Sequence, residues 1–203
     1  MSRPLLYRFD DANITITGEL IYYDTSVIIE QWGKSEKPFR QKEVQEFHNR
    51  VAREGAISVS GILGQIEIRT AVTGAFVKAA RTNKHRSRKL VIANNAGIMK
   101  QVAQTSRSIY EAMERDINHI ILPQTYITLE LIEEVDNLMS QCDIEYIDAL
   151  HYAIAKKEGI KLIATLDSDY MNIPDPNLKI LTDSENYQKL LARYGITITA
   201  ANI

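Results

Sequence analysis

The chain has 203 residues, of which 45% are hydrophobic and 25% charged, a composition typical of a globular protein rather than a disordered chain. Its 24 Lys and Arg against 26 Asp and Glu give a net charge of −2, with no overall signature of nucleic-acid binding. The single cysteine, Cys142, excludes an intramolecular disulfide and a cysteine-rich zinc module, and no segment is apolar enough for a signal peptide or a membrane span, so we expect a cytoplasmic protein without membrane contact.

The N-terminal part of the chain predicts a β-hairpin followed by alternating strands and helices. Residues 13–17 alternate Ile with Asn and Thr up to Gly18, and residues 19–23 are apolar after Glu19, so we predict a hairpin that leads into a strand. Thr25 and Ser26 can cap a helix that runs to Trp32. Helical spacing of apolar residues predicts further helices over 41–54 and 61–80, with a short strand at 56–60 between them.

The C-terminal part repeats this alternation. Residues 90–93 form a short apolar segment after a basic stretch, and the pattern predicts helices over 99–116, 125–140, 146–158 and 183–194, with strands at 119–122, 161–165 and 178–181. Residues 196–200 again alternate Ile and Thr, and could pair with 13–17 as a small added ribbon. Short strands that alternate with helices predict a parallel α/β sheet covered on both faces.

Four acidic residues occupy positions that do not serve solubility. Asp24 and Asp167 end predicted strands, while Asp148 and Glu67 lie among apolar neighbours in the early turns of predicted helices. Functional sites of open α/β sheets form at the carboxyl ends of the strands, and desolvating several carboxylates together is costly unless a cation is present. Taken singly, Asp24 and Asp148 could be helix caps. Together, the four acids predict a pocket that holds Mg²⁺ or Mn²⁺.

The segments around these acids resemble the PIN-domain nuclease family. Four segments carry the resemblance in the family's order: residues 21–28 (IYYDTSVI), residues 57–60 with Ile66 and Glu67, residues 146–155 (YIDALHYAIA) and residues 162–170 (LIATLDSDY). The resemblance implies a PIN-like three-layer α/β fold with a short-stranded, mainly parallel sheet flanked by helices. We expect one domain over 1–203, with an N-terminal β-hairpin extension (1–19), a PIN core (20–182) and a C-terminal helix and tail (183–203).

The resemblance also implies an activity and a set of site residues. It implies a Mg²⁺- or Mn²⁺-dependent endoribonuclease that leaves 5′-phosphate and 3′-hydroxyl ends, as in the VapC-type toxins, which commonly dimerise and are inhibited by an antitoxin protein. The residues that match the family's catalytic, metal-binding acids are Asp24, Glu67, Asp148 and Asp167, with Asp169 as an outer ligand and Thr25 and Thr165 as hydroxyls beside the metal. The alternative is a PIN-like module that binds RNA or protein with little or no cleavage.

A basic stretch between the second and third motifs is the candidate RNA contact. Residues 78–89 contain six Lys or Arg and no acid, which is the charge pattern of a phosphate-binding surface or of a solvated helix end and loop. The first interpretation assigns RNA binding to Arg81, Lys84, Arg86, Arg88 and Lys89. His151 lies three residues after Asp148, on nearly the same helix face, and we expect it to pack or to form hydrogen bonds rather than to act as a general base.

Overall fold

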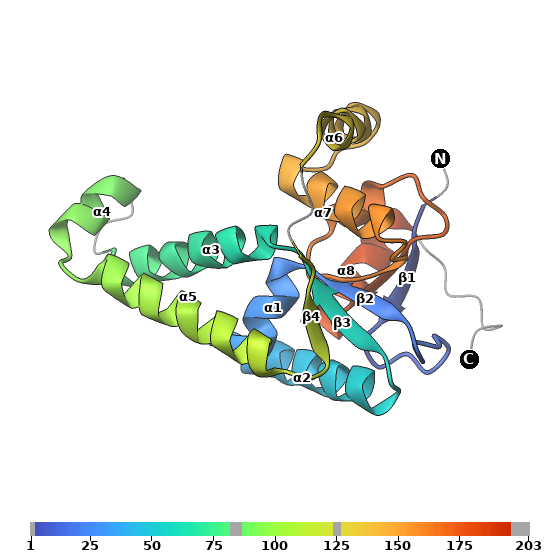
Figure 1. Ribbon diagram of the computed structural model, residues 1–203, viewed down its shortest axis with the longest axis horizontal. Coiled ribbons are helices and arrows are strands. Elements are labelled where there is room, and N and C mark those ends of the chain that lie inside the picture. Colours follow the sequence, from blue (N-terminus) through green and yellow to red (C-terminus); the bar gives the residue numbers. More distant parts are fainter. Residues whose placement is uncertain (1–2, 82–86, 124–126, 196–203) are drawn as a thin grey trace.

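The computed structural model describes residues 3–81, 87–123 and 127–195, and in this part of the chain a six-stranded parallel sheet lies between two layers of helices (Figure 1). The strand order is β1-β6-β5-β2-β3-β4, and every neighbouring pair is parallel. The strands are β1 (Leu5–Arg8), β2 (Leu20–Tyr23), β3 (Ile57–Ser60), β4 (His119–Ile121), β5 (Leu162–Ala164) and β6 (Lys179–Thr182). The predicted three-layer α/β fold is confirmed.

Two hydrophobic cores form, one on each face of the sheet. Buried residues of α1 (Thr25–Trp32), α2 (Pro38–Arg53), α3 (Leu63–Ala80) and α5 (Ile98–Arg115) make the first core, and those of α6 (Leu129–Gln141), α7 (Tyr146–Lys157) and α8 (Ser184–Tyr194) make the second. Because successive side chains of a strand point to opposite faces, β2 contributes Tyr23 to the first core and Tyr22 to the second. The carboxyl end of β2 therefore lies between both helical layers.

A pair of long helices extends away from the sheet. In Figure 1, α3 and α5 lie side by side and run in opposite directions, with the short α4 (Arg88–Asn94) at their far end. Val72 and Val77 of α3, Val91 of α4, and Ile98 and Val102 of α5 are buried in the first core, which therefore continues along the pair. We call these three helices the arm.

The predicted N-terminal hairpin is wrong. Residues 13–17 form no strand, and the chain instead begins with β1, an edge strand parallel to β6. The alternation that suggested a strand is real, because Ile14 and Ile16 are buried in the core. The carbonyl oxygen of Ile14, however, accepts a hydrogen bond from the Arg50 side chain and not from a neighbouring strand. A half-buried loop thus produces the same pattern of apolar residues as a strand.

Most other predicted elements are present with shifted ends. The helix predicted over 41–54 begins at Pro38, since proline is favoured in the first helical turn. The helix predicted over 125–140 begins at Leu129, because the Thr128 side chain caps it by accepting a hydrogen bond from the Leu131 amide. Residues 90–93 lie in α4, and a 3₁₀ turn, η1 (Asp169–Asn172), follows β5. Residues 124–126 and the proposed ribbon strand at 196–200 lie outside the described residues.

The contacts of Arg50 generate a prediction about stability. This buried side chain donates hydrogen bonds to the carbonyl oxygens of Phe9, Asp11 and Ile14 and to the Glu54 carboxylate. Replacing it by Met leaves these acceptors without a donor, so we expect Arg50→Met to lower the free energy of unfolding in urea by about 3 kcal/mol or more. The exposed Arg53 of the same helix is the control, and Arg53→Met should change stability by less than about 0.5 kcal/mol. Equal losses in the two variants would contradict this role of Arg50.

Candidate metal centre

Asp24 is held at the carboxyl end of β2 by the residues around it. Its side chain caps α1 by accepting a hydrogen bond of 2.8 Å from the Thr25 amide. Its second carboxylate oxygen accepts hydrogen bonds from the hydroxyls of Ser26 (2.6 Å) and Thr165 (2.9 Å). Only 5% of the residue is exposed. Asp24 is therefore both the helix cap that the sequence permitted and a buried carboxylate with fixed orientation.

Glu67 approaches this position from the second turn of α3. One of its carboxylate oxygens, Oε2, accepts a hydrogen bond of 2.6 Å from the Thr25 hydroxyl and lies 2.5 Å from Nε2 of His151. Burial tends to raise the pKa of Glu67, but the hydrogen bond and charge of His151, together with the Thr25 hydroxyl, outweigh it and lower the pKa. Glu67 is thus stabilised in its ionised form.

Asp148 lies in the first turn of α7, on the other side of the sheet's carboxyl edge. Burial raises the pKa of this carboxyl to about 7, and the negative charges of Asp24, Asp167 and Glu67 contribute in the same direction. Burial is the largest cause of this shift, and the neighbouring carboxylates outweigh the opposing charge of His151. A bound cation would remove this imbalance.

Asp167 lies in the loop after β5, and Asp169 is the first residue of η1. The Asp167 amide donates to the Thr165 hydroxyl, and the Asp169 amide donates to the Asp167 carboxylate, each at 2.9 Å. Carboxylate oxygens of Asp148, Asp167 and Asp169 lie within 4.8 Å of one another, as do potential ligand atoms of Asp24, Glu67 and His151. The structure therefore brings the five predicted acids and the two predicted threonines to one edge of the sheet.

Three residues that the sequence analysis did not place at the site also contribute to it. His151, which is 1% exposed, lies between Glu67 and the Tyr22 hydroxyl and so has the hydrogen-bonding role that we expected for it. Ser26 joins the ends of two strands, because its hydroxyl donates to Asp24 and accepts from the Leu166 amide. The spacing of His151 from Asp148 was a usable signal, but nothing in the sequence singled out Tyr22.

The donor atoms at this edge suit a hard divalent cation. Apart from the His151 imidazole they are carboxylate and hydroxyl oxygens, the ligand type that Mg²⁺ and Mn²⁺ prefer. Within the described ranges, Oε1 of Glu67 has no hydrogen-bond donor, and the Tyr170 hydroxyl is buried without a partner. The charges of Asp24 and Asp148 add to burial in raising the pKa of Tyr170 well above its usual value. The residues present therefore fit a Mg²⁺ or Mn²⁺ ion.

Those predicted RNA-binding residues that the structure describes lie apart from the acids. Arg81, Arg88 and Lys89 are exposed at the far end of the arm, while Lys84 and Arg86 lie outside the described residues. Arg81 follows Glu67 by fourteen residues, which corresponds to about 20 Å along the axis of α3. The basic stretch is thus not part of the acidic site itself. No helix in the described part of the chain is both long and apolar enough to cross a membrane.

Comparisons with known proteins agree with this geometry at the level of the family. The family model described as PIN domain matches residues 21–176, a range that contains Asp24, Glu67, Asp148, Asp167 and Asp169. No curated protein matches the sequence closely enough to be a relative. Among solved structures, the crystal structure of Mycobacterium tuberculosis VapC20, described as a Sarcin-Ricin loop cleaving toxin, is similar with a TM-score of 0.41 and 15% identity, over 74% of this chain and 92% of that chain. This likeness is too slight to carry an argument about activity.

The raised pKa of Asp148 predicts how the metal-free protein responds to pH. A carboxyl with a pKa of 3.8 when unfolded and about 7 when folded binds more protons in the folded state, so its ionisation destabilises the fold as pH rises from about 4 to about 7. We expect Asp148→Asn to stabilise the protein in EDTA at pH 8 by roughly 1–2 kcal/mol, with a smaller gain at pH 5. Thermal unfolding over this pH range measures the effect, with the exposed Asp136→Asn on α6 as control. A gain that does not depend on pH would contradict the prediction.

Proposed function

The chain belongs to the PIN-domain family, and on this premise we propose that it is a Mg²⁺- or Mn²⁺-dependent endoribonuclease. The observation that carries the proposal is the convergence of carboxylates from the end of β2, α3, α7 and the loop after β5 on one place, with Asp148 raised to a pKa of about 7. Carboxylates so arranged repel one another and the phosphates of RNA, and a divalent cation relieves both repulsions. A cluster of carboxylates with only a structural role would gain nothing from this repulsion.

We assign each residue a role from its contacts. Asp24, with one oxygen held by two hydroxyls, and Glu67, with one oxygen free, are oriented metal ligands, while Asp148 and Asp167 complete the set and Asp169 is an outer ligand. Thr25 and Thr165 donate to Glu67 and Asp24 and so hold these carboxylates in place, and the Thr25 hydroxyl also favours the ionised form of Glu67. A bound divalent ion would supply charge stabilisation at the phosphate and a water of lowered pKa.

The arm is the proposed RNA-binding surface of this nuclease. From Ile68 to Tyr110 the sequence contains nine Lys or Arg and not one Asp or Glu, although the whole chain has net charge −2. Among the described residues, no carboxylate forms an ion pair with Arg81, Arg88, Lys89 or Lys100. A protruding segment of one charge sign attracts a polyanion and steers it toward the body of the protein. This supports RNA binding by Arg81, Arg88 and Lys89 and, beyond the described residues, by Lys84 and Arg86.

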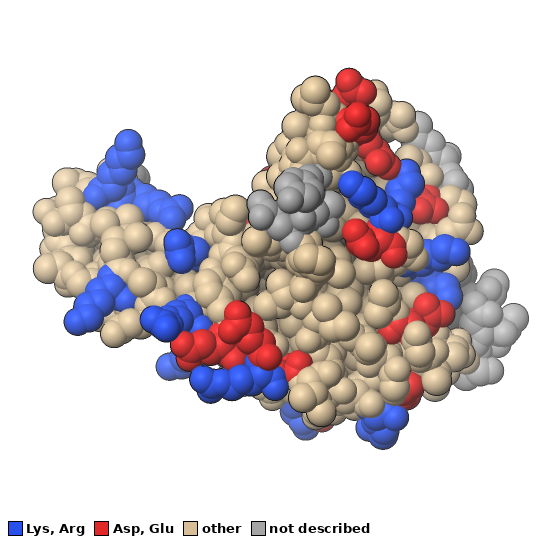
Figure 2. All heavy atoms as spheres, in the orientation of Figure 1, with Lys and Arg blue, Asp and Glu red and all other residues tan. Residues whose placement is uncertain are grey.

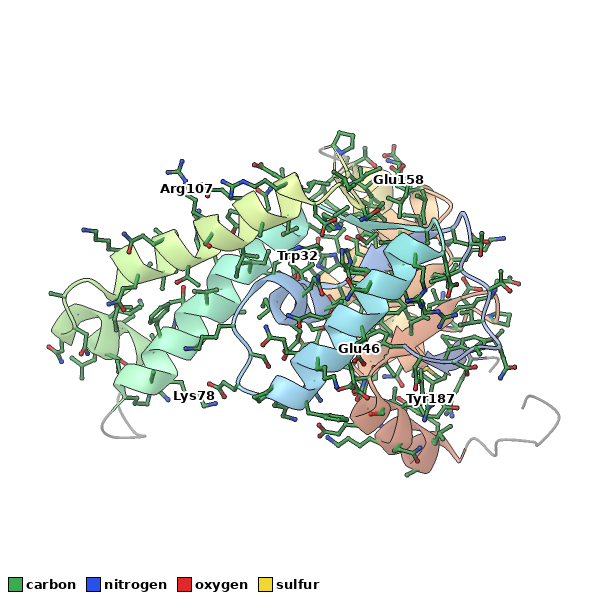
Figure 3. The ribbon with its side chains drawn as sticks, turned by 90° about the horizontal axis from the view of Figure 1, so that it is seen from below. Trp32, Glu46, Lys78, Arg107, Glu158 and Tyr187 are labelled. Atoms are coloured by element: carbon green, nitrogen blue, oxygen red, sulfur yellow. The ribbon has the colours of Figure 1, made fainter. Side chains whose placement is uncertain are left out.

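The shape of the molecule is consistent with this arrangement. Figure 2 shows a hollow between the arm and the helices of the second layer, and the outer half of the arm carries Lys and Arg but no Asp or Glu on this face. Glu67 and Asp148 lie near the starts of α3 and α7, the helices on either side of this hollow (Figure 1). Lys78 and Arg107 lie on opposite edges of the helix pair (Figure 3). RNA bound along the arm would therefore have access to the acids.

We further propose that the protein is the toxin of a toxin–antitoxin pair, that it forms a homodimer and that an antitoxin protein inhibits it. Membership of the PIN-domain family supports these proposals. We also propose that residues 1–203 form one domain, in keeping with the strand β1, which joins the sheet of the PIN core by pairing with β6. A location in the cytoplasm is proposed on the same basis.

The proposed function is tested by cleavage of RNA with Mg²⁺, with Mn²⁺ and with EDTA. We expect cleavage only with metal, and a loss of at least about 100-fold in Asp24→Asn and Asp148→Asn, because each removes a charged ligand. Retained folding of both variants is the control. Induced expression in bacterial cells tests the toxin role: the wild-type protein should arrest growth and Asp24→Asn should not. Equal growth would exclude that role, and absence of both cleavage and metal binding would favour an RNA- or protein-binding module instead.

The role of the arm is tested by the salt dependence of RNA binding in EDTA, where cleavage is absent. Replacing Arg81, Lys89 and Lys100 by Gln should weaken binding and reduce the slope of log affinity against log salt by about 2, since each phosphate contact to a single strand contributes about 0.7. The matched control replaces three exposed cations of the body, Arg53, Lys157 and Lys161, and changes the net charge equally. Equal loss in both triple variants, measured by fluorescence anisotropy, would mean that overall charge and not the arm holds RNA.

A further inference from the structure

The two tyrosines at the end of β2 form the same kind of contact on opposite faces of the sheet. The Tyr22 hydroxyl lies 2.7 Å from Nδ1 of His151, whose Nε2 is next to Glu67. The Tyr23 hydroxyl lies 3.2 Å from Nδ1 of His48, whose Nε2 lies 2.8 Å from the Asp116 carboxylate. Both tyrosines are fully buried. Only the first of these chains, Tyr22–His151–Glu67, ends at the metal centre.

The surroundings of His151 determine where its proton lies. The backbone of Gly61, in the loop after β3, lies against the Tyr22 hydroxyl. A side chain at position 61 would interfere with this, because a Cβ atom there would lie only 2.8 Å from the Tyr22 hydroxyl. Ionised Glu67 only accepts hydrogen bonds, so Nε2 of His151 carries a proton directed at it, whether the imidazole is neutral or charged. Nδ1 of His151 faces the Tyr22 hydroxyl, which can donate a hydrogen bond to it or accept one from it.

The consequence for Glu67 is that its two oxygens differ. Oε2 receives the His151 N–H and the Thr25 hydroxyl, at 2.5 and 2.6 Å, and Oε1 receives no hydrogen bond from the described part of the chain. A glutamate on a helix surface has three rotatable side-chain bonds and samples many orientations unless contacts restrict them. Two donors on one oxygen fix the carboxylate and leave the other oxygen available as a ligand.

We propose that Tyr22 and His151 are positioning residues that orient Glu67 so that its Oε1 meets the metal ion. The proposal rests on the proposed function, because it requires a cation at this site. Neither residue is a ligand: the Tyr22 hydroxyl bonds His151, and Nε2 of His151 is occupied by Glu67. Partners that orient a ligand in this way commonly contribute 10–100-fold to metal affinity. The buried histidine therefore has a role beyond filling the space between β2 and α7.

The experiment compares Tyr22→Phe with Tyr23→Phe by calorimetric titration with Mn²⁺. Both changes remove one buried hydroxyl that contacts Nδ1 of a histidine, so Tyr23→Phe controls for the loss of stability. We expect Tyr22→Phe to weaken Mn²⁺ binding by about fivefold, since the His151 ring loses the contact that holds Nδ1, and Tyr23→Phe to leave it unchanged. His151→Leu should weaken binding by about 10–100-fold, and His151→Gln, which retains an N–H donor, should recover most of that loss.

The outcomes separate this proposal from the proposed function. If the wild-type protein binds Mn²⁺ and Tyr22→Phe and His151→Leu bind it equally well, the positioning role is overturned and the metal centre stands. If the wild-type protein binds no Mn²⁺, both fail. Should the variants not fold, nitrogen-15 NMR of wild-type His151 at pH 8 gives the result directly: a proton on Nε2 and a response to Mg²⁺ support the proposal. Absence of a proton from Nε2, or the same response to Mg²⁺ at His48, overturns it.

Discussion

Burial of carboxylates at the carboxyl edge of β5, β2 and β3 is the constraint around which this site is built. Asp24, Glu67 and Asp148 come from three different elements, and burial disfavours the charged forms of Glu67 and Asp148. The structure keeps the first two oriented with donors from Thr25, Ser26, Thr165 and His151, and it leaves the third with a pKa of about 7. The folded protein thus contains a carboxyl group whose ionisation is unfavourable, as is common at functional sites.

The position of β2 explains how one short strand supports both the fold and the site. It lies in the middle of the sheet between β5 and β3, and its last two side chains enter different hydrophobic cores. Tyr22 extends toward His151 in α7, and Tyr23 toward His48 in α2. Each helical layer is therefore joined to β2 by a buried tyrosine–histidine contact. Asp24 follows directly, so it leaves a strand that is held on both faces of the sheet.

Charge is distributed unevenly between the body and the arm. The arm contributes a long run of sequence without an acidic residue, whereas acids gather at the carboxyl edge of the sheet. This separation of charge is in keeping with the proposed roles of the two regions, in which the arm attracts a polyanion and the acids hold cations. The continuous apolar core between α3 and α5 keeps the two regions in a defined relation, because these helices pack along their length.

The sequence by itself determined the alternation of strands and helices, the parallel sheet and the positions of the acids, since strand periodicity and acidic residues at strand ends are local signals. It did not determine that residues 13–17 form a buried loop, because a loop held by Arg50 and a strand bury alternate residues alike. Nor did it indicate the pairing of β1 with β6 or the chain from Tyr22 through His151 to Glu67, whose members are far apart in sequence. Only tertiary structure decided these contacts, because each depends on which side chains packing brings within hydrogen-bond distance.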